Sequence, residues 1–410
     1  MSIYRIQAFP PRLLSLALAA LLASGCTTAV TGVQPASQPA AASGSGKPQA
    51  PLVLRTMGSL YFGGTVTRAA DGETFHGDHG YAQYYIPEHA RTLPIVMWHG
   101  IGQSGRSFES TPDGREGFMS ILPRRDWPVY IIDQPRRGRA GRTQAQADSG
   151  YAVPTTLRES AAWDAFRVGV WTPPKPAHAF PGVQMPLDPA TVDQFFRQQT
   201  PDTGTHPFTA EHRAFMGRTV GELFRQVGPA VLLTHSHSGQ YGWSTAMNAP
   251  DLVKAVVAYE PGQFAFPEGE RPPEIVSVAE GVREAMEPQM VSQAQFQKLT
   301  RMPIIIIYGD YISPDPSPVF NVDLWRVASA RARQFVDAVN RHGGDAQLII
   351  LPQLGIKGNS HAPFADLNNV EIADHLEKFL GSKRLDGRAT PHAGPRRPAI
   401  STNTIPLETF

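Results

Sequence analysis

The sequence predicts an α/β fold with a mostly parallel, doubly wound sheet and an inserted cap region. Helical patterns at 211–227, 240–248, 327–341 and 368–380 alternate with short apolar runs rich in Val, Ile and Tyr. Continuous runs of this kind are typical of strands buried on both faces of a parallel sheet, and their alternation with helices implies helices on both faces. The runs are SLYFGGTV, YAQYYI, PIVMW, PVYIID, AVLLT, KAVVAY, PIIIIY and AQLIIL. No helical pattern separates the first two, so we expect them to pair as antiparallel strands.

One stretch between the predicted strands is too long for a simple crossover. Residues 143–210 contain Trp163, Trp171, Phe195 and Phe196 among many prolines. Long segments between core strands are commonly functional, often as lids. We therefore interpret this stretch as a cap over a site.

The N-terminal residues predict export. Residues 1–26 combine basic residues with an apolar run that is too short to span a bilayer comfortably and that ends in small residues. The last of them, Cys26, is the only cysteine in the chain, and it ends LLASGC, which resembles a bacterial lipoprotein processing site. We expect a lipidated protein of the cell envelope, or a secreted protein if Cys26 carries no lipid. Residues 27–51, rich in Ala, Ser, Pro and Gly, are predicted to be a disordered tether to a domain at 52–382, and 383–410 a disordered tail.

Composition excludes several classes of function. The chain has 410 residues, 41% hydrophobic and 18% charged, with a net charge of +1, so it lacks the basic footprint of a nucleic-acid-binding protein. His76 and His79 have no third ligand nearby in the sequence, so we expect no metal site. No sequence pattern calls for a cofactor. The expected partner is a small molecule, with membrane contact only through a lipidated N-terminus.

A candidate nucleophile follows the AVLLT run. In open α/β sheets, ligands bind at the carboxyl ends of the strands, and a nucleophile on a tight strand-to-helix turn requires small residues two positions before and after it. Ser236 meets this requirement, because Thr234 and Ser238 flank it. Ser238 would instead have the bulky Gln240 as a flank. We therefore predict Ser236 as the nucleophile, the alternative being that these serines only cap a helix.

Two further loops supply candidate donors and a base. The loop HGIGQSG after PIVMW is expected to bring the backbone N–H of Ile101 over the nucleophile, together with that of His237, where they would stabilise the oxyanion of an acyl transfer. The glycines of this loop could equally serve turn geometry alone. His361 lies in a Gly/Asn/Ser loop before the final helix and is the predicted base, because imidazole titrates near neutral pH.

The acid that orients the imidazole has two candidates. Glu260 ends the KAVVAY run and Asp310 ends the PIIIIY run. Neighbouring parallel strands end at the same edge of the sheet, so either carboxylate could reach His361. Asp310 also has a plain structural role, since Asp at the start of a turn caps its own backbone. Chemistry alone leaves both candidates open.

Taken together, five segments resemble a bacterial group of α/β-hydrolase esterases described as acting on esters of halogenated cyclic compounds. The segments span about 52–382 and are WHGIGQSGRSFESTPDGREGF, PVYIIDQPRRGRAGR, LLTHSHSGQ, AYEPG and GNSH. The resemblance implies an α/β-hydrolase fold, and TPDGR with DQPRRGR carries it more specifically than the serine turn does. It also implies that the acid is Glu260 rather than Asp310, and that Ile101 and His237 are the oxyanion donors.

The chain departs from that group beside the predicted site. Ile101 and Gly102 stand where a member of the group has adjacent cysteines, so no vicinal disulfide can form here. His237 stands where Gln is commoner. Both differences bear on the range of substrates.

The resulting hypothesis is a serine esterase that forms an acyl-enzyme on Ser236, acting on bulky or apolar esters. A lactonase or amidase on the same residues, and a non-catalytic binding protein on the same scaffold, are the alternatives. A dehalogenase would need a carboxylate nucleophile, and Ser236 argues against it.

Overall fold

The computed structural model describes residues 50–141, 158–199 and 208–388. The predicted signal segment 1–26 with Cys26, most of the predicted tether and residues 389–410 lie outside these ranges. In the described part of the chain, no helix is both long and apolar enough to cross a membrane.

An eight-stranded sheet forms the centre of the domain, in the order β1-β2-β4-β3-β7-β8-β11-β12. From β4 to β12 all neighbouring strands run parallel, whereas β1 pairs with β2, and β2 with β4, in antiparallel fashion. The predicted fold class and the antiparallel start are therefore confirmed. The strands are β1 (Leu54–Arg68), β2 (Thr74–Pro87), β3 (Ile95–Trp98), β4 (Val129–Asp133), β7 (Ala230–His235), β8 (Val253–Tyr259), β11 (Pro303–Tyr308) and β12 (Asp345–Ile350).

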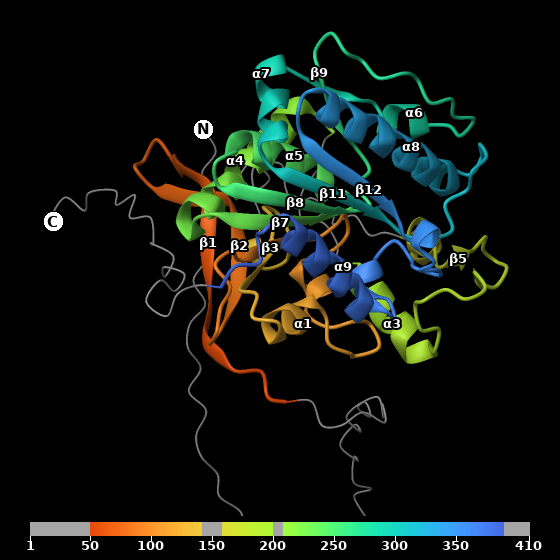
Figure 1. Cartoon of the computed structure of the whole chain (residues 1–410), viewed down its shortest axis with the longest axis horizontal. Coiled ribbons are helices and arrows are strands. Elements are labelled where there is room, and N and C mark those ends of the chain that lie inside the picture. Colours follow the sequence, from red (N-terminus) through yellow and green to blue (C-terminus); the bar gives the residue numbers. More distant parts are fainter. Residues whose placement is uncertain (1–49, 142–157, 200–207, 389–410) are drawn as a thin grey trace, which may run out of the picture. The chain divides into compact units, whose positions relative to one another are not determined.

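Helices cover both faces of the sheet, as Figure 1 shows. One hydrophobic core joins α4, α5 and α8 to one face of the strands, and a second core joins α1, α2, α3 and α9 to the other. The helices are α1 (Phe118–Arg124), α2 (Glu159–Ala165), α3 (Pro189–Arg197), α4 (Ala210–Val227), α5 (Ser238–Asn248), α6 (Val282–Ala285), α7 (Gln293–Phe296), α8 (Phe320–Arg341) and α9 (Asn369–Ser382). The four predicted helices correspond to α4, α5, α8 and α9.

Short elements complete the domain. Two small sheets pair β5 with β6 and β9 with β10. Their strands are β5 (Gly169–Val170), β6 (His178–Ala179), β9 (Ala265–Pro267) and β10 (Gln289–Val291). The 3-10 helices are η1 (Gly105–Phe108), η2 (Gly138–Ala140), η4 (Gln297–Arg301), η5 (Leu351–Leu354) and η6 (Pro363–Ala365).

The parallel strands are buried on both faces of the sheet. Every residue of β3, β4 and β7 is buried, and so are all but one residue of β8 and of β11. Continuous Val/Ile runs can be buried in this way because helices cover both faces of a parallel sheet. In contrast, half-buried and exposed positions alternate along the first half of β1, which is typical of a sheet with one solvated face.

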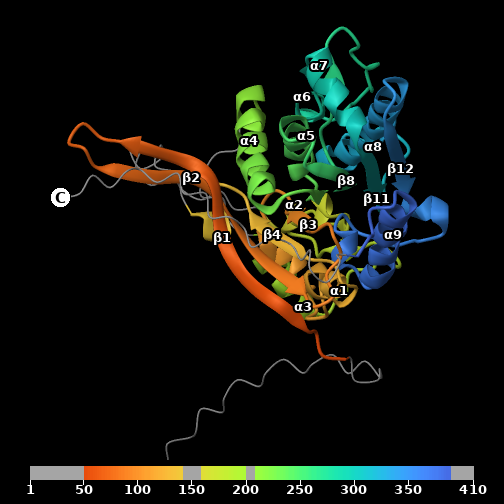
Figure 2. The ribbon, with the colours of Figure 1, turned by 60° about the vertical axis from the view of Figure 1, so that its left-hand side comes forward.

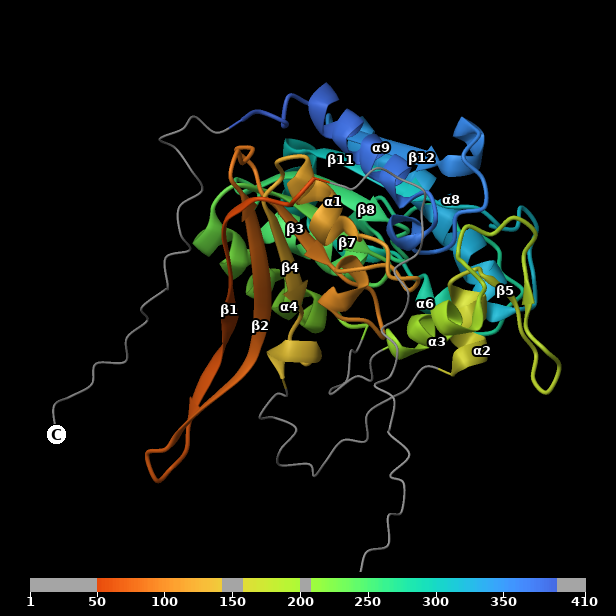
Figure 3. The ribbon, with the colours of Figure 1, turned by 90° about the horizontal axis from the view of Figure 1, so that it is seen from below.

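The β1–β2 hairpin extends beyond the rest of the sheet. Only Tyr81–Tyr85 of β2 pair with β4, while β1 and β2 continue to pair with each other as far as Arg68 and Thr74. Figures 2 and 3 show the tip of the hairpin running past the other strands. The hairpin is therefore an outlying arm that projects past Asp133, the carboxyl end of β4.

The chain after the last helix continues along the domain. The N–H of Thr92 donates to the carbonyl of Gly387 (2.8 Å), and the Arg91 guanidinium donates to the carbonyl of Asp386 (2.6 Å). Residues up to 388, which include the first residues of the predicted tail, therefore hydrogen-bond to the segment between β2 and β3. The tail was predicted from amino-acid composition, which carries no information about contacts with distant segments.

Candidate active site

Ser236 lies on a sharp turn between β7 and α5. Its φ of 55° is left-handed, a conformation that is rare for residues other than glycine and that marks strain held by the surroundings. The N–H of Ser236 donates to the carbonyl of Tyr259 on β8 (2.9 Å), and its carbonyl accepts from the N–H of Gly239 (3.0 Å). A strained serine between a strand and a helix is the geometry expected of a nucleophile turn.

Close packing beneath the turn explains its small residues. A Cβ on Gly239 would lie 2.5 Å from the Cβ of Pro261, which follows β8. Ser238 is fully buried, and its hydroxyl accepts from the N–H of His235 (3.0 Å) while lying within hydrogen-bond distance of the carbonyls of Trp98 and His235. The Ser238 hydroxyl therefore ties the turn together, while Ser236 occupies the strained position.

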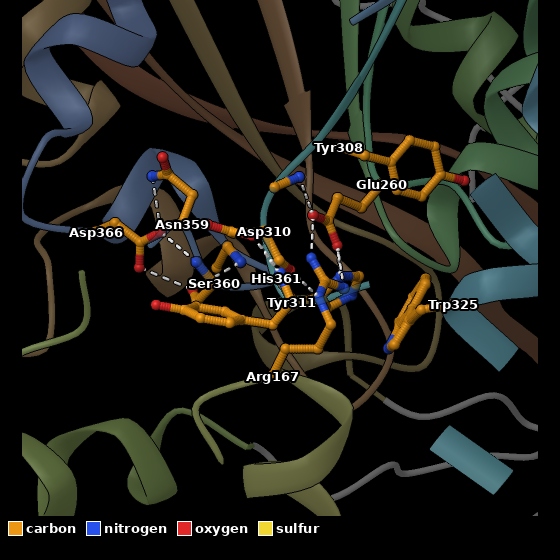
Figure 4. Close-up of polar contacts among 12 residues, drawn as sticks. Arg167, Glu260, Tyr308, Asp310, Tyr311, Trp325, Asn359, Ser360, His361 and Asp366 are labelled. Atoms are coloured by element: carbon orange, nitrogen blue, oxygen red, sulfur yellow. Dashed lines mark hydrogen bonds and ion pairs between the residues drawn. The ribbon is translucent and has the colours of Figure 1, made fainter. Parts of the chain in front are cut away.

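The structure brings His361 and Glu260 into direct contact. His361 lies in the loop between β12 and α9, and its Nδ1 hydrogen-bonds to Oε2 of Glu260, as Figure 4 shows. An ionised carboxylate only accepts hydrogen bonds, so Nδ1 carries the proton and Nε2 is left as an acceptor. Both side chains are buried, and Glu260 has a left-handed φ of 50° at the end of β8.

Arg167, from the inserted segment, holds the other side of Glu260. Its Nη1 donates to Oε2 (2.7 Å), its Nη2 forms an ion pair with Oε1, and its Nε donates to the carbonyl of Asp310 (2.7 Å). The N–H of Gly309 also donates to Oε1 (2.5 Å). Sequence reasoning missed Arg167, because nothing in the chain links it to a residue 93 positions away; an arginine among the cap aromatics was the only available signal.

Burial and charge together set the protonation states. Burial alone would raise the pKa of Glu260, but the positive charge of Arg167, the imidazole of His361 and hydrogen bonds from both lower it to about 2. Burial lowers the pKa of His361 and outweighs the raising effect of Glu260. At neutral pH the pair therefore holds an ionised carboxylate next to a neutral imidazole, which is the state a general base requires.

Asp310 is placed differently from Glu260. Its carboxylate accepts from the N–H of Tyr311 (2.7 Å) and from the N–H of Gly358 (2.8 Å). Asp310 thus caps its own turn and holds the start of the His361 loop, while the contact with the imidazole belongs to Glu260.

Aromatic rings enclose the imidazole. The rings of Trp325 and Phe166 lie 4.1 and 5.2 Å from that of His361, centroid to centroid. A second imidazole, His235, lies 4.6 Å away and its Nε2 is 2.9 Å from the carbonyl oxygen of His361. Burial lowers the pKa of His235 well below its usual value, so it is neutral and its Nε2–H donates to that carbonyl. None of these three neighbours was singled out from the sequence.

The loop after β3 lies against the serine turn. A Cβ on Gly100 would be 3.1 Å from the Cβ of Ser236 and 2.9 Å from Nδ1 of His235. Ile101 follows directly, with its side chain 42% exposed. His237 follows Ser236 at the start of α5, and its Nε2 lies 2.8 Å from the Tyr241 hydroxyl. The two predicted oxyanion donors are therefore carried by two segments that meet at Ser236.

A small cavity adjoins this group of residues. The predicted cap contributes part of its apolar lining, although 142–157 and 200–207 lie outside the described residues. The lining residues are Gln103, Ser107, Pro112, Phe166, Met185, Phe195, Gln198, Ser360, Ala362, Phe364, Ala365 and Asp366.

No cluster of three or more His, Cys, Asp or Glu side chains suited to a metal occurs within residues 50–141, 158–199 and 208–388. His76 and His79 lie on β2, in its extended arm.

Comparisons with known proteins bear on the fold and on the class of enzyme. No protein-family model matches the chain. The chain is 26% identical over 326 residues to the "Probable secreted lipase phiG" of Fungal sp. (strain ATCC 74256), covering 72% of this chain and 83% of that protein. A solved structure described as a novel bacterial esterase superposes with a TM-score of 0.63 at 29% identity, covering 82% of this chain and 98% of the other. With the sheet order and its helices on both faces, these likenesses lead to one conclusion: the chain is an enzyme with the α/β-hydrolase fold.

Proposed function

We propose that the chain is a serine esterase in which Ser236 is the nucleophile, His361 the general base and Glu260 the acid that orients it. The observation that carries this proposal is the buried His361–Glu260–Arg167 group, at the sheet edge where Ser236 occupies a strained turn. Each residue follows a parallel strand or lies in a loop above it, apart from Arg167, which comes from the insertion.

Two proteins that the chain resembles over most of their lengths are both named as ester hydrolases. One is named a secreted lipase and the other a bacterial esterase. The chain is accordingly a carboxylic ester hydrolase.

The proposed reaction runs through an acyl-enzyme. The Ser236 hydroxyl loses its proton to Nε2 of His361 as Oγ bonds to the ester carbonyl carbon, and the backbone N–H groups of Ile101 and His237 stabilise the oxyanion. The carbon–oxygen bond to the alcohol then breaks, and the alcohol leaves with the proton from the imidazolium. Water repeats the sequence on the acyl-enzyme and releases the acid. Glu260 stabilises the imidazolium in both halves.

Apolar esters are the proposed substrates. Phe166, Met185, Phe195 and Phe364 line the cavity beside the His361 loop, and such a wall favours a hydrocarbon or aryl group. The likeness to esterases of halogenated cyclic compounds is consistent with this class. Ile101, where a member of that group has a cysteine, is proposed to alter the contacts with the substrate.

Export and anchoring are also proposed. The related lipase is named as secreted, which is consistent with the signal-like segment before Cys26. Lipidation of Cys26 would hold the enzyme at the cell envelope.

A labelling experiment tests the proposal. A fluorophosphonate should modify the wild-type protein and Ser238→Ala but not Ser236→Ala, and hydrolysis of p-nitrophenyl acetate, butyrate and octanoate should follow the same pattern. Ser238→Ala is the matched control, since it lies two residues away and its hydroxyl serves the turn. Labelling of Ser236→Ala at the wild-type rate would refute the assignment, and unlabelled, inactive wild-type protein would favour a binding role.

A further inference from the structure

We propose that Arg115, in the TPDGR motif, is a positioning residue for His361 that acts through Asp366. The inference rests on the proposed function, because it assigns a role in the same reaction. TPDGR, with DQPRRGR, carried the family resemblance more specifically than the serine turn did, yet none of its residues belongs to the proposed machinery. Its contacts show what it holds.

The motif forms a turn that orients the arginine before it reaches across the domain. The N–H of Thr111 donates to the carbonyl of Arg115 (3.1 Å), and the Thr111 hydroxyl donates to Oδ1 of Asp113 (2.5 Å). Oδ2 of Asp113 accepts from Nε of Arg115 (2.6 Å). Gly114, with a φ of 83°, allows the chain to close this turn. The guanidinium is thus fixed on one edge by its own turn.

The opposite edge of the guanidinium holds a distant segment. Nη1 donates to the Leu367 carbonyl (3.2 Å) and to Oδ1 of Asn369 (3.1 Å), and Nη2 donates to the carbonyls of Asp366 (3.1 Å) and Ala365 (3.5 Å). These groups lie 250 or more residues away in sequence, immediately after the His361 loop. One side chain therefore holds three consecutive backbone carbonyls, those of residues 365–367, together with the side-chain amide of Asn369 at the start of α9.

Asp366 transmits this restraint to the loop of the base, as Figure 4 shows. Its Oδ2 accepts from the N–H of Ser360 (2.7 Å) and from the amide of Asn359 (3.0 Å), and its Oδ1 accepts from the Ser360 hydroxyl (2.7 Å). The Ser360 hydroxyl in turn accepts from the N–H of Ala362 (3.1 Å). The residues on both sides of His361 are thereby tied, directly or through Ser360, to the carboxylate of Asp366. The backbone carbonyl of the same residue accepts from Arg115.

This chain of contacts affects the rate because the reaction depends on the exact position of the His361 imidazole. Its Nδ1 faces Glu260 in a buried site, so a shift of the loop would move Nε2 relative to Ser236 Oγ. A misplacement of about 1 Å in a reacting group can cost about a hundredfold in rate. Asp366 is itself buried, and burial raises its pKa to about 7 in spite of the hydrogen bonds from Ser360 and Asn359. A carboxyl kept in so unfavourable a place is consistent with a role in holding the loop.

The test compares Arg115→Met with Arg125→Met. Arg125 is a matched control: it is similarly exposed (21% against 26% of the side chain), and it bonds to Glu377 and Asp374 of α9 rather than to the loop. For Arg115→Met we expect kcat for p-nitrophenyl acetate to fall between tenfold and a hundredfold, roughly the cost of a loop shift, with KM within about twofold. Fluorophosphonate labelling should slow by the same factor as kcat. Arg125→Met should lower the melting temperature by a similar amount and leave kcat unchanged.

Arg115→Lys and Asp366→Asn keep the proposal testable if Arg115→Met does not fold. Lysine can donate to some of the carbonyls but cannot span all of them, so its kcat should lie between those of Arg115→Met and the wild type. Combining Arg115→Lys with Asp366→Asn should lower kcat by little more than Asp366→Asn alone, because both act on one loop.

The inference would be overturned by wild-type kcat and labelling rate in Arg115→Met, or by fully multiplicative losses in the Arg115→Lys, Asp366→Asn double variant. Equal loss of kcat in Arg125→Met at equal stability would also overturn it. Ser236→Ala separates this inference from the proposed function. If Ser236→Ala retains turnover, the proposed function itself fails; if Ser236→Ala is inactive while Arg115→Met is not impaired, only the role of Arg115 fails.

Discussion

Glu260→Gln is the substitution for which the structure makes the most demanding prediction. Glutamine keeps the size of the side chain but removes the charge that faces both His361 and Arg167. Loss of the residue that orients the imidazole lowers turnover by about four orders of magnitude in related triads, or about 5.4 kcal/mol of transition-state stabilisation. We therefore expect Glu260→Gln to be nearly inactive.

The same substitution should also destabilise the protein, which the sequence alone did not suggest. Arg167 is only 4% exposed and Glu260 is fully buried. Removing one partner of a buried ion pair costs about 3–5 kcal/mol, because the remaining charge stays in the interior unpaired. At about 2 °C per kcal/mol for a large domain, the melting temperature should fall by about 6–10 °C.

A double variant separates the two effects. In Glu260→Gln combined with Arg167→Met, no buried charge is left without a partner, so most of the lost stability should return while turnover stays near zero. Turnover of p-nitrophenyl acetate and thermal melts are measured for the wild type, both single variants, the double variant and Asp310→Asn. Asp310→Asn should keep substantial turnover and melt slightly earlier, since its carboxylate accepts only from the N–H groups of Tyr311 and Gly358.

Three results would refute this reasoning. Turnover in Glu260→Gln within about tenfold of the wild type would remove Glu260 from the proposed triad. Greater loss of turnover in Asp310→Asn at equal stability would move the acid to the later strand. Restored turnover in the double variant would mean that Glu260 serves only to neutralise Arg167.

The remaining predictions concern pH and the N-terminus. Because burial lowers the pKa of His361 and the base must be neutral, the acid limb of the kcat/KM profile should have its midpoint below pH 6.5; a midpoint above 6.5 would contradict the buried geometry. The pKa of Glu260 falls from 4.5 to about 2 on folding, so the stability that this group contributes is present above pH 4.5 and is lost as the pH falls towards 2. The melting temperature of the wild type should therefore fall more over this interval than that of the Glu260→Gln, Arg167→Met double variant. Equal melting curves of the two proteins across the interval would exclude such a contribution. Cys26 should carry lipid, measured as globomycin-sensitive processing and detergent-phase partitioning of the expressed precursor, and a soluble mature protein that lacks Cys26 would instead indicate plain secretion.

Much of the site could be anticipated because its parts follow strands. Ser236, Glu260 and Asp310 each lie within two residues of the end of a predicted strand, and parallel strands end at one edge of the sheet. His361 was identified by its loop before the final helix. Local sequence was sufficient for these positions, because strand periodicity and small residues at a tight turn are properties of neighbouring residues.

Local sequence could not decide which of the two carboxylates orients the imidazole. Glu260 and Asp310 follow adjacent strands, β8 and β11, and both are acidic residues next to a turn. Only the path of the β12–α9 loop decides which one meets the imidazole. That path depends on two hydrogen bonds with Asp310: the N–H of Gly358 donates to its carboxylate, and the carbonyl of Asn359 accepts from its N–H. No local pattern carries that information.

The sequence by itself determined the α/β architecture, the order of the parallel strands along the chain and the turn that carries Ser236. The tertiary structure alone decided that Arg167 of the insertion neutralises Glu260 and that Arg115 reaches the segment after His361. The physical reason is the range of the interactions. Periodicity and turn sterics act between neighbours in the chain. The partners of the Arg167 and Arg115 guanidinium groups are instead set by whichever segments the packed helices and loops bring together, a carboxylate 93 residues away for Arg167 and backbone carbonyls about 250 residues away for Arg115.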